Sequence, residues 1–207
     1  MTDTQHLKKT PLHDRHLAAG ARMVAFAGFE MPVQYRGVVA EHEAVRGAVG
    51  LFDVSHMGEV ELRGPRAVEV ADRILTNHIG KLEDGQACYT CMCRPDGGIV
   101  DDLVVYRVSS AHVFICVNAA NREKDFAYME EVAGGDCALE DTGDAWAQIA
   151  VQGPKAPQLV DELTSAELSA VRSYRFIRGE VAGAEGLVAR TGYTGEDGYE
   201  LYVPAER

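Results

Sequence analysis

The sequence predicts an α+β fold in which an antiparallel α+β domain is inserted into a discontinuous, β-rich first domain. Between residues 53 and 141 the hydrophobic pattern indicates the order βαβββαβ, which is typical of an antiparallel sheet covered by helices. From residue 142 onward, short strands joined by glycine turns follow, and we expect them to pair with the N-terminal segment. Residues 1–52 and 142–207 are therefore assigned to the first domain, and residues 53–141 to the inserted domain.

The composition is that of a globular protein with an acidic surface. The 207 residues are 46% hydrophobic, so the chain can bury a substantial core. A net charge of −12 argues against unspecific binding to nucleic acid or to an anionic membrane surface, and it favours small ligands and protein partners. No uncharged apolar run of eighteen residues and no leader pattern in the first twenty residues are present, so we expect a cytoplasmic chain.

The N-terminal part is expected to be irregular, because glycine and proline recur through residues 1–36 among short extended pieces. His13 and His16 are three residues apart, which on a helix would place them on one face and allow them to hold a metal. A capped surface turn is the simpler interpretation of this pair. Residues 39–49 have apolar positions near a 3.6 period and predict a short amphipathic helix that ends at Gly50.

The inserted domain has regular patterns. Period-two alternation predicts its strands, and a proline at position 65 is suited to the first turn of a helix. The predicted elements, in order, are a strand at 59–62, a helix at 65–75, strands at 87–93, 99–107 and 112–118, a helix at 121–132 and a strand at 137–140. After residue 142 the predicted elements are a strand at 146–151, a helix at 154–163 and strands at 174–181, 187–190 and 199–203.

Three cysteines, Cys88, Cys91 and Cys93, lie close together at a spacing that resembles a metal knuckle. The flanking pattern is that of a strand, which places Cys88 on one face and the other two on the opposite face. No second Cys/His pair at knuckle spacing follows. The sequence therefore predicts no metal site here, and the cysteines are interpreted as buried small hydrophobic residues.

Two adjacent carboxylates, Asp101 and Asp102, lie in the apolar strand at 99–107, directly after a turn at 95–98. Successive side chains of a strand point to opposite faces, and both faces here are apolar, so at least one carboxylate is short of water. Such a group needs hydrogen-bond donors, a cation or a raised pKa. Two interpretations follow. The pair fixes the turn, or it supplies an acid/base or cation-orienting carboxylate at a ligand pocket.

The second glycine-rich stretch, residues 190–200, lacks the lysine and the following helix of a phosphate-binding loop. The simplest interpretation is a hairpin whose tip is Glu196-Asp197-Gly198. That interpretation does not account for Tyr193 and Glu200, which offer a ring face for stacking and a hydrogen-bond acceptor. Together these groups suit a flat, amino-substituted aromatic ligand.

Six sequence blocks, taken together, resemble the glycine cleavage system T protein, or aminomethyltransferase, family. They occur in the family's order and run from near the N-terminus to the last residues. The blocks are residues 23–28 (MVAFAG), 52–57 (FDVSHM), 97–103 (GGIVDDL), 117–119 (VNA), 150–154 (AVQGP) and 191–196 (TGYTGE). Each block is weak alone, but six in register are specific.

The resemblance implies a tetrahydrofolate-dependent enzyme that takes the aminomethyl group from the lipoyl arm of the H protein, releases ammonia and forms 5,10-methylenetetrahydrofolate. It implies that Asp101 is the catalytic carboxylate and that Asp102 is structural. By the same resemblance the folate contacts would be Asn118, Tyr193 and Glu200, with Met57, Tyr89 and Tyr106 lining the pocket. For the last three residues, core packing is the equal alternative.

The family continues beyond the region that this chain matches, through more of the first domain and into a C-terminal β-barrel domain that supplies arginines for the folate tail. We therefore expect a fragment or a shortened paralogue, and an inactive folate-binding module is the main alternative. Folate-binding domains of the sarcosine and dimethylglycine dehydrogenases carry the same blocks, but no Gly-x-Gly-x-x-Gly for a flavin is present. A folate-binding accessory protein of iron–sulfur assembly is a further alternative, favoured only by Cys88-Tyr89.

Overall fold

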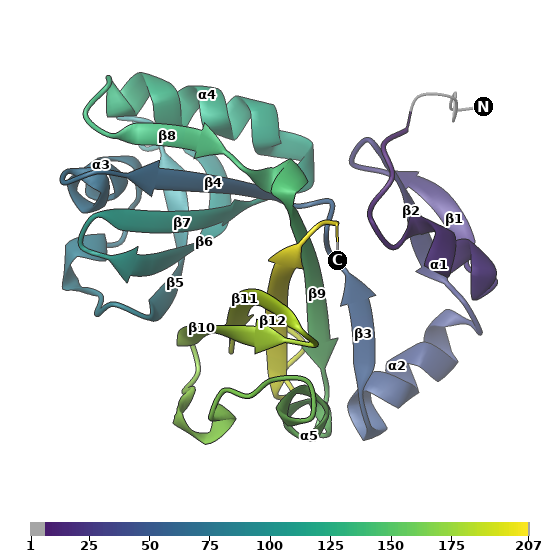
Figure 1. Cartoon of the computed structure of the whole chain (residues 1–207). Helices are drawn as coiled ribbons and strands as arrows, with labels where there is room; N and C mark the ends of the chain where they lie inside the picture. The colour runs from purple at the N-terminus through teal and green to yellow at the C-terminus, as the bar shows by residue number, and fades with distance from the viewer. Residues whose placement is uncertain (1–6, 207) are drawn as a thin grey trace. The chain divides into compact units, whose positions relative to one another are not determined.

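The computed structural model describes residues 7–206, and it has the predicted α+β fold with antiparallel sheets (Figure 1). The chain forms two compact units. Unit 1 is discontinuous and comprises Met1–His56, Ala145–Ser173 and Ile177–Arg207, and unit 2 comprises Met57–Asp144 and Tyr174–Phe176. Residues 1–6 and 207, which the predicted first domain includes, lie outside the described residues.

Unit 2 has the predicted order βαβββαβ. Its strands form one sheet in the order β5-β6-β7-β4-β8, and every neighbouring pair is antiparallel. The elements are β4 (Gly58–Arg63), α3 (Ala67–Ile74), β5 (Gln86–Cys93), β6 (Ile99–Ser109), β7 (His112–Val117), α4 (Arg122–Ala133) and β8 (Ala138–Asp141). A short 3₁₀ turn, η3 (Ala119–Asn121), joins β7 to α4, so that the end of β7 leads directly into the helix.

The helices of unit 2 pack their apolar sides against the sheet. In α3 the buried residues Ala67, Val70, Ala71 and Ile74 follow the spacing of one helix face. They join one apolar core with sheet residues such as Val105, together with Met129 of α4. This core holds β6 in place and fixes which of its side chains face the helices.

Unit 1 contains a two-stranded and a five-stranded sheet. The larger sheet has the order β10-β11-β12-β9-β3, in which β12 pairs antiparallel with both β11 and β9, and β3 lies at the edge. The elements are α1 (His13–Ala18), β1 (Arg22–Phe26), β2 (Phe29–Gln34), α2 (Val38–Gly47), β3 (Gly50–Asp53), β9 (Trp146–Gln152), α5 (Ala156–Asp161), β10 (Phe176–Val181), β11 (Ala184–Ala189) and β12 (Gly198–Pro204).

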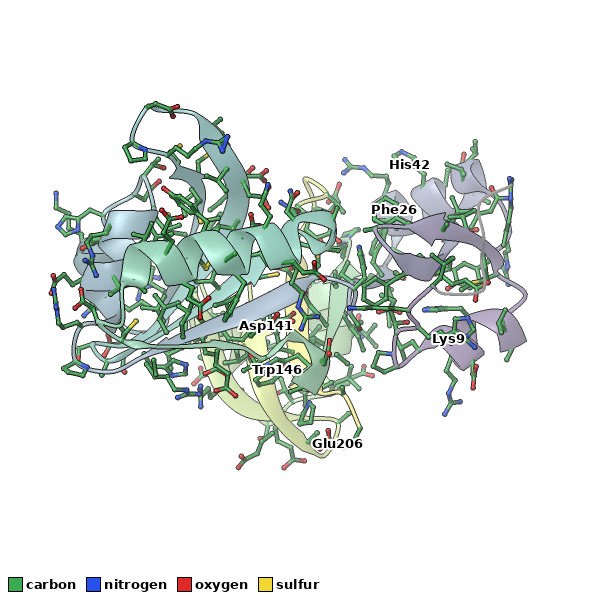
Figure 2. The ribbon with its side chains drawn as sticks, turned by 90° about the horizontal axis from the view of Figure 1, so that it is seen from above. Lys9, Phe26, His42, Asp141, Trp146 and Glu206 are labelled. Atoms are coloured by element: carbon green, nitrogen blue, oxygen red, sulfur yellow. The ribbon has the colours of Figure 1, made fainter. Side chains whose placement is uncertain are left out.

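The pairing of β3 with β9 explains the discontinuity of unit 1. Residues 50–53 form the strand at the edge of a sheet whose other strands come from the C-terminal part of the chain. The core under this sheet includes Val151 of β9, Val160 of α5 and Leu201 of β12. Phe26, labelled in Figure 2, ends β1, and more than half of its surface is exposed.

The structure corrects the interpretation of the two N-terminal histidines. His13 and His16 lie on the helix α1 and are buried, not exposed on a capped surface turn. His13 Nε2 lies 2.8 Å from Glu30 Oε2, and His16 Nε2 lies 2.8 Å from Asp53 Oδ2. Because each ring has a carboxylate partner from another element, the pair ties α1 to β2 and β3.

Two further details differ from the sequence prediction. The first helix of unit 2 begins at Ala67, so Pro65 precedes the helix instead of occupying its first turn. Cys88, Cys91 and Cys93 are half-buried on β5, not fully buried, and all three are free thiols. Within residues 7–206 no group of three or more metal-ligating side chains is found.

Candidate functional site

Asp101 lies near the start of β6, at the end of the sheet where the 94–98 turn enters. It pairs with Met92 of β5, and only 7% of its surface is exposed. Since Asp101 shares a strand face with Leu103 and Val105, which belong to the core under the helices, its side chain points to the helix side of the sheet. The carboxylate is therefore held in a largely water-free position.

The side chain of Asn118 stabilises the charge of this carboxylate. Its amide Nδ2 donates to Asp101 Oδ1 at 3.1 Å and to the backbone oxygen of Asp102 at 2.8 Å. Burial alone would raise the pKa of Asp101, but its interactions with the side chains of Asp125, Asn118 and Asn121 outweigh burial and hold this pKa below its ordinary value. Asp101 is thus an ionised carboxylate with a fixed orientation at neutral pH.

Asp102 and Tyr89 form a second pair on the opposite face of the sheet. The Tyr89 hydroxyl donates to Asp102 Oδ2 at 2.7 Å, and this hydrogen bond raises the pKa of Tyr89. More than half of the Tyr89 surface is exposed. The two adjacent aspartates therefore have different surroundings, one buried under the helices and one linked to an exposed tyrosine.

Tyr106 is fully buried in the core of unit 2. Its ring packs edge to face against Phe114 of β7 and against Phe176, with centroids 5.6 and 5.3 Å apart. This position agrees with core packing, the alternative that the sequence left open for Tyr106. Met57, the first residue of unit 2, is half-buried.

Glu200 lies in the middle of β12, between Ala150 of β9 and Ala189 of β11, and is 7% exposed. Gln148 Nε2 donates to Glu200 Oε1 at 2.8 Å, and the Thr191 hydroxyl donates to Glu200 Oε2. Each carboxylate oxygen has two lone pairs and can accept a second hydrogen bond. Glu200 is therefore a buried, oriented acceptor.

Tyr193 lies on the loop between β11 and β12, and 58% of its surface is exposed. Its ring approaches Phe52 of β3 edge to face, with centroids 6.5 Å apart. The buried side chain of Gln152 anchors the loop, because its Oε1 accepts hydrogen bonds from Tyr193 N and Thr194 Oγ1. Arg46 of α2 adds a hydrogen bond to the Thr194 carbonyl. The loop thus presents an exposed ring on a fixed backbone.

The sequence-predicted residues fall into two groups. In unit 2, Asp101 and Asn118 are in direct contact, and Tyr89 contacts the neighbouring Asp102. In unit 1, Tyr193 and Glu200 are held by different glutamines of β9, Gln152 and Gln148.

Sequence reasoning did not single out Asp125 or Gln152. Both are fully buried polar side chains that support predicted site residues. The signal for Gln152 was its place beside the Gly153-Pro154 turn in a resembling block.

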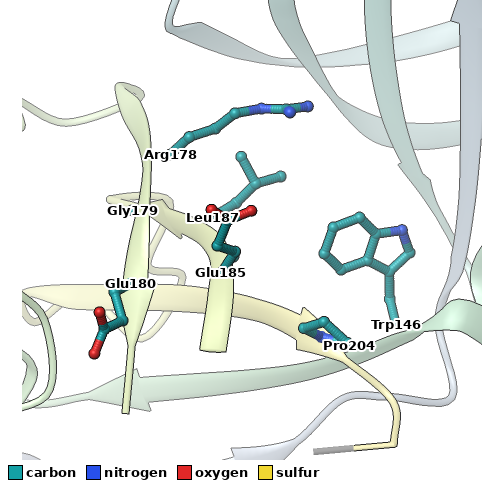
Figure 3. A pocket seen from close by; sticks show the side chains of 8 residues that line it. Trp146, Arg178, Gly179, Glu180, Glu185, Leu187 and Pro204 are labelled. Atoms are coloured by element: carbon teal, nitrogen blue, oxygen red, sulfur yellow. The ribbon is translucent and has the colours of Figure 1, made fainter. Parts of the chain in front are cut away.

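Several hollows occur on the described part of unit 1, among them the following two. One, of about 590 Å³, is lined by Trp146, Arg178, Glu185 and neighbouring residues of β10–β12 (Figure 3), and contains none of the predicted site residues. The other, of about 480 Å³, is lined by Phe52 and Thr194 together with residues of α2. Because Thr194 follows Tyr193 directly and Phe52 contacts its ring, the second hollow adjoins the predicted ligand-stacking residue.

Sequence comparison identifies a family. Residues 12–207 match the family model described as the GCVT N-terminal domain. The chain is 51% identical over 201 residues to an aminomethyltransferase from Desulfitobacterium hafniense and 47% identical over 201 residues to one from Bacillus subtilis. Each alignment covers 97% of this chain, but 55% and 56% of those proteins, so the chain spans about half the length of the curated relatives it matches.

Comparison with solved structures agrees with the sequence comparison. The glycine cleavage system aminomethyltransferase T from Bartonella henselae superposes with a TM-score of 0.89 at 34% identity, over 97% of this chain and 54% of that chain. A heterotetrameric sarcosine oxidase from Corynebacterium shares the fold, with a TM-score of 0.63 at 15% identity, covering 96% of this chain and 88% of that chain. None of the helices in the described part of the chain is long and apolar enough to cross a membrane.

Proposed function

Because the chain belongs to the GCVT N-terminal domain family, we propose that it binds tetrahydrofolate as part of an aminomethyltransferase of the glycine cleavage system. The reaction takes the aminomethyl group from the lipoyl arm of the H protein, releases ammonia and yields 5,10-methylenetetrahydrofolate. Its partners are the lipoylated H protein and the other components of that system, and its place is the cytoplasm. The observation that carries this proposal is the buried, ionised Asp101.

The reaction needs a group that moves protons. The transferred carbon loses its bonds to the lipoyl sulfur and to the amino nitrogen, and it gains bonds to the two folate nitrogens. Of the two hydrogens that leave those nitrogens, one completes the lipoyl thiol and the other completes ammonia. Asp101 is suited to hold or pass such a proton, because it is buried, oriented by Asn118 and charged at neutral pH.

The residues of unit 1 have a binding role in this proposal. Tyr193 offers an exposed ring on an anchored loop, and stacking of flat rings favours such a surface. Glu200 offers two oriented carboxylate oxygens, which suit the amino and ring N–H groups of a pterin. In unit 2, Asn118 is proposed as a further folate contact, and Met57 and Tyr89 as pocket-lining residues. Tyr106, being buried among Phe114 and Phe176, would support the pocket from the core.

Activity is tested by incubating the chain with aminomethylated H protein and tetrahydrofolate and measuring ammonia and 5,10-methylenetetrahydrofolate. Asp101→Asn should lower turnover by about 10²-fold or more, within the range of general acid–base catalysis. Asp102→Asn is the matched control, because it changes the adjacent carboxylate on the opposite face and should cost much less. Equal rates for wild type and Asp101→Asn, or no product at all, would contradict the proposed activity.

A further inference from the structure

Asp125, on the first turn of α4, is a buried carboxyl group for which the proposed reaction gives no role. None of its surface is exposed, and neither of its oxygens receives a hydrogen bond from an N–H or hydroxyl donor of residues 7–206. A carboxylate left in this state would be costly, because burial removes its water and nothing replaces it. The group therefore needs either a cation or a proton.

The neighbouring cation is only partly available to Asp125. Lys124 Nζ lies 3.6 Å from Asp125 Oδ1, but it donates its short hydrogen bond, 2.7 Å long, to the backbone oxygen of Val100. About half of the Lys124 side chain is exposed to water, which screens its charge. The helix N-terminus also favours a negative charge, though only by about 0.3–1 kcal/mol at such positions.

The other group that faces Asp125 is the carboxyl of Asp101 on β6. Asp101 points to the helix side of the sheet, and Lys124, next to Asp125, reaches the backbone oxygen of Val100, next to Asp101, at 2.7 Å. At this junction of α4 and β6 the two carboxyl groups influence each other, which lowers the pKa of Asp101 and raises that of Asp125. Asp101 Oδ2 is buried and, like the oxygens of Asp125, receives no hydrogen bond from a donor of the described residues. Two carboxylates at this range repel each other strongly, and a shared proton removes that repulsion and supplies the missing hydrogen bond.

The asymmetry of the surroundings decides which carboxyl group keeps the proton. Asn118 and Asn121 donate to Asp101 and stabilise its charge. Asp125 has no such amide donor, and burial together with the charge of Asp101 raises the pKa of Asp125 to about 8. The proton therefore resides on Asp125 at neutral pH.

We propose that Asp125 is a positioning residue that keeps its proton at neutral pH and donates it to Asp101 Oδ2. This hydrogen bond, with that from Asn118 to Oδ1, holds both oxygens of Asp101 and keeps it ionised. The pair carries one negative charge. The inference about the proton concerns this chain alone, whereas its consequence for catalysis rests on the proposed function.

The first experiment measures the proton directly. Carboxyl carbons of the chain, labelled with ¹³C at aspartate, are followed by NMR between pH 5 and pH 10, in wild type, Asp125→Asn and Glu123→Gln. One aspartate should titrate near pH 8 in wild type and in Glu123→Gln, which alters an exposed carboxylate of the same helix. That titration should be missing from Asp125→Asn. If every aspartate in the wild type is ionised by pH 6, the proposal is wrong.

A second readout separates this hydrogen bond from simple packing. Asn at position 125 keeps an N–H donor toward Asp101, whereas Leu keeps the volume and removes the donor. The pKa of Asp101 should stay low in Asp125→Asn and rise by about one unit or more in Asp125→Leu. An unchanged pKa of Asp101 in a folded Asp125→Leu chain would overturn the proposal. If Asp125→Leu does not fold, the Asp125→Asn titration above decides.

The two proposals fail in different ways. If the chain binds no tetrahydrofolate but the titration near pH 8 is present and depends on Asp125, the folate function is wrong and the carboxyl pair is correct. If folate is bound and turned over without any such titration, the carboxyl pair is wrong and the function stands.

Discussion

The Asn118 side chain joins both adjacent aspartates of β6, because its Nδ2 donates to Asp101 Oδ1 at 3.1 Å and to the backbone oxygen of Asp102 at 2.8 Å. Asn118 directly follows β7, the neighbour of β6 in the sheet. A single amide thus fixes the carboxylate and the backbone beside it. This arrangement explains how a sheet strand can hold a charged group in a buried and reproducible position.

Replacing Asn118 by Leu should therefore damage both stability and the charge state of Asp101. Two hydrogen bonds are lost, and the buried carboxylate loses a donor, so the free energy of unfolding should fall by about 1–3 kcal/mol. The pKa of Asp101 should rise, since one cause of its lowering is removed. Urea unfolding followed by circular dichroism measures the first effect. A variant as stable as the wild type would show that the amide is not structurally important.

Gly198 should be intolerant of a side chain. A Cβ at this position would lie 2.2 Å from Gln152 Oε1, the atom that anchors the Tyr193 loop. Gly198→Ala should lower the free energy of unfolding by about 1–3 kcal/mol, as expected for overpacking in a dense core.

Gly47→Ala is the matched control for Gly198→Ala, because a Cβ at this exposed position of α2 would meet nothing within 4 Å. Alanine there should be neutral or stabilising by about 0.5–1 kcal/mol. The fluorescence of the single tryptophan, Trp146, reports unfolding of unit 1. Equal stability of the two variants would contradict the packing argument.

Asp53 should make unit 1 sensitive to acid. Its buried side chain accepts hydrogen bonds from the Thr10 hydroxyl at 2.6 Å and from His16 Nε2 at 2.8 Å. Burial raises the pKa of Asp53, but hydrogen bonds from His16, Thr10 and Ser55 outweigh it and lower this pKa below the ordinary value of 3.8. Stabilisation by Asp53 is therefore present above pH 3.8 and is lost as pH falls through the lower folded-state pKa.

The test is to measure the free energy of unfolding of the wild type and of Asp53→Asn as a function of pH. At pH 7 this variant should be less stable than the wild type by about 1.5–3 kcal/mol, the range for hydrogen bonds to a charged group. The difference should shrink as the pH falls below 4. Asp14→Asn, which changes an almost fully exposed carboxylate of α1, should have little effect at any pH. A difference for Asp53→Asn that grows toward acid would contradict the assigned sign.

Tyr106 should act through packing and not through its hydroxyl at a ligand. Tyr106→Phe keeps the edge-to-face contacts with Phe114 and Phe176 and should leave the affinity for tetrahydrofolate within twofold of the wild type. Tyr106→Ala should cost about 3–5 kcal/mol of unfolding free energy, as for large-to-small changes in a core. A large loss of affinity in Tyr106→Phe with unchanged stability would place the hydroxyl at the ligand.

The local hydrophobic pattern of the sequence was sufficient to predict the fold of unit 2. Period-two alternation placed its strands, and the α+β class follows from their order with the two helices. The same alternation correctly placed Asp101 and Asp102 on opposite faces of β6. It missed the edge strand β3, because Leu51 is 62% exposed and the four-residue strand lacks a buried face.

Long-range partners could not be predicted in the same way. The local pattern around His13 and His16 favours a surface turn, because their carboxylate partners, Glu30 and Asp53, lie 17 and 37 residues away in the sequence. Asp125 was overlooked for a related reason. Its helix is rich in charge, and only the packing of α4 on the sheet shows that this one carboxyl group is fully buried beside Asp101.

Calorimetric titration of the chain with tetrahydrofolate under reducing conditions tests whether Tyr193 and Glu200 form a folate site. We expect micromolar binding that is weakened at least tenfold by Tyr193→Ala and by Glu200→Gln. Leu17→Ala, which removes an exposed apolar side chain of α1, should leave the affinity unchanged. No binding heat for the folded wild-type chain, or equal affinity in the Tyr193→Ala and Glu200→Gln variants, would contradict the claim that these residues form a folate site.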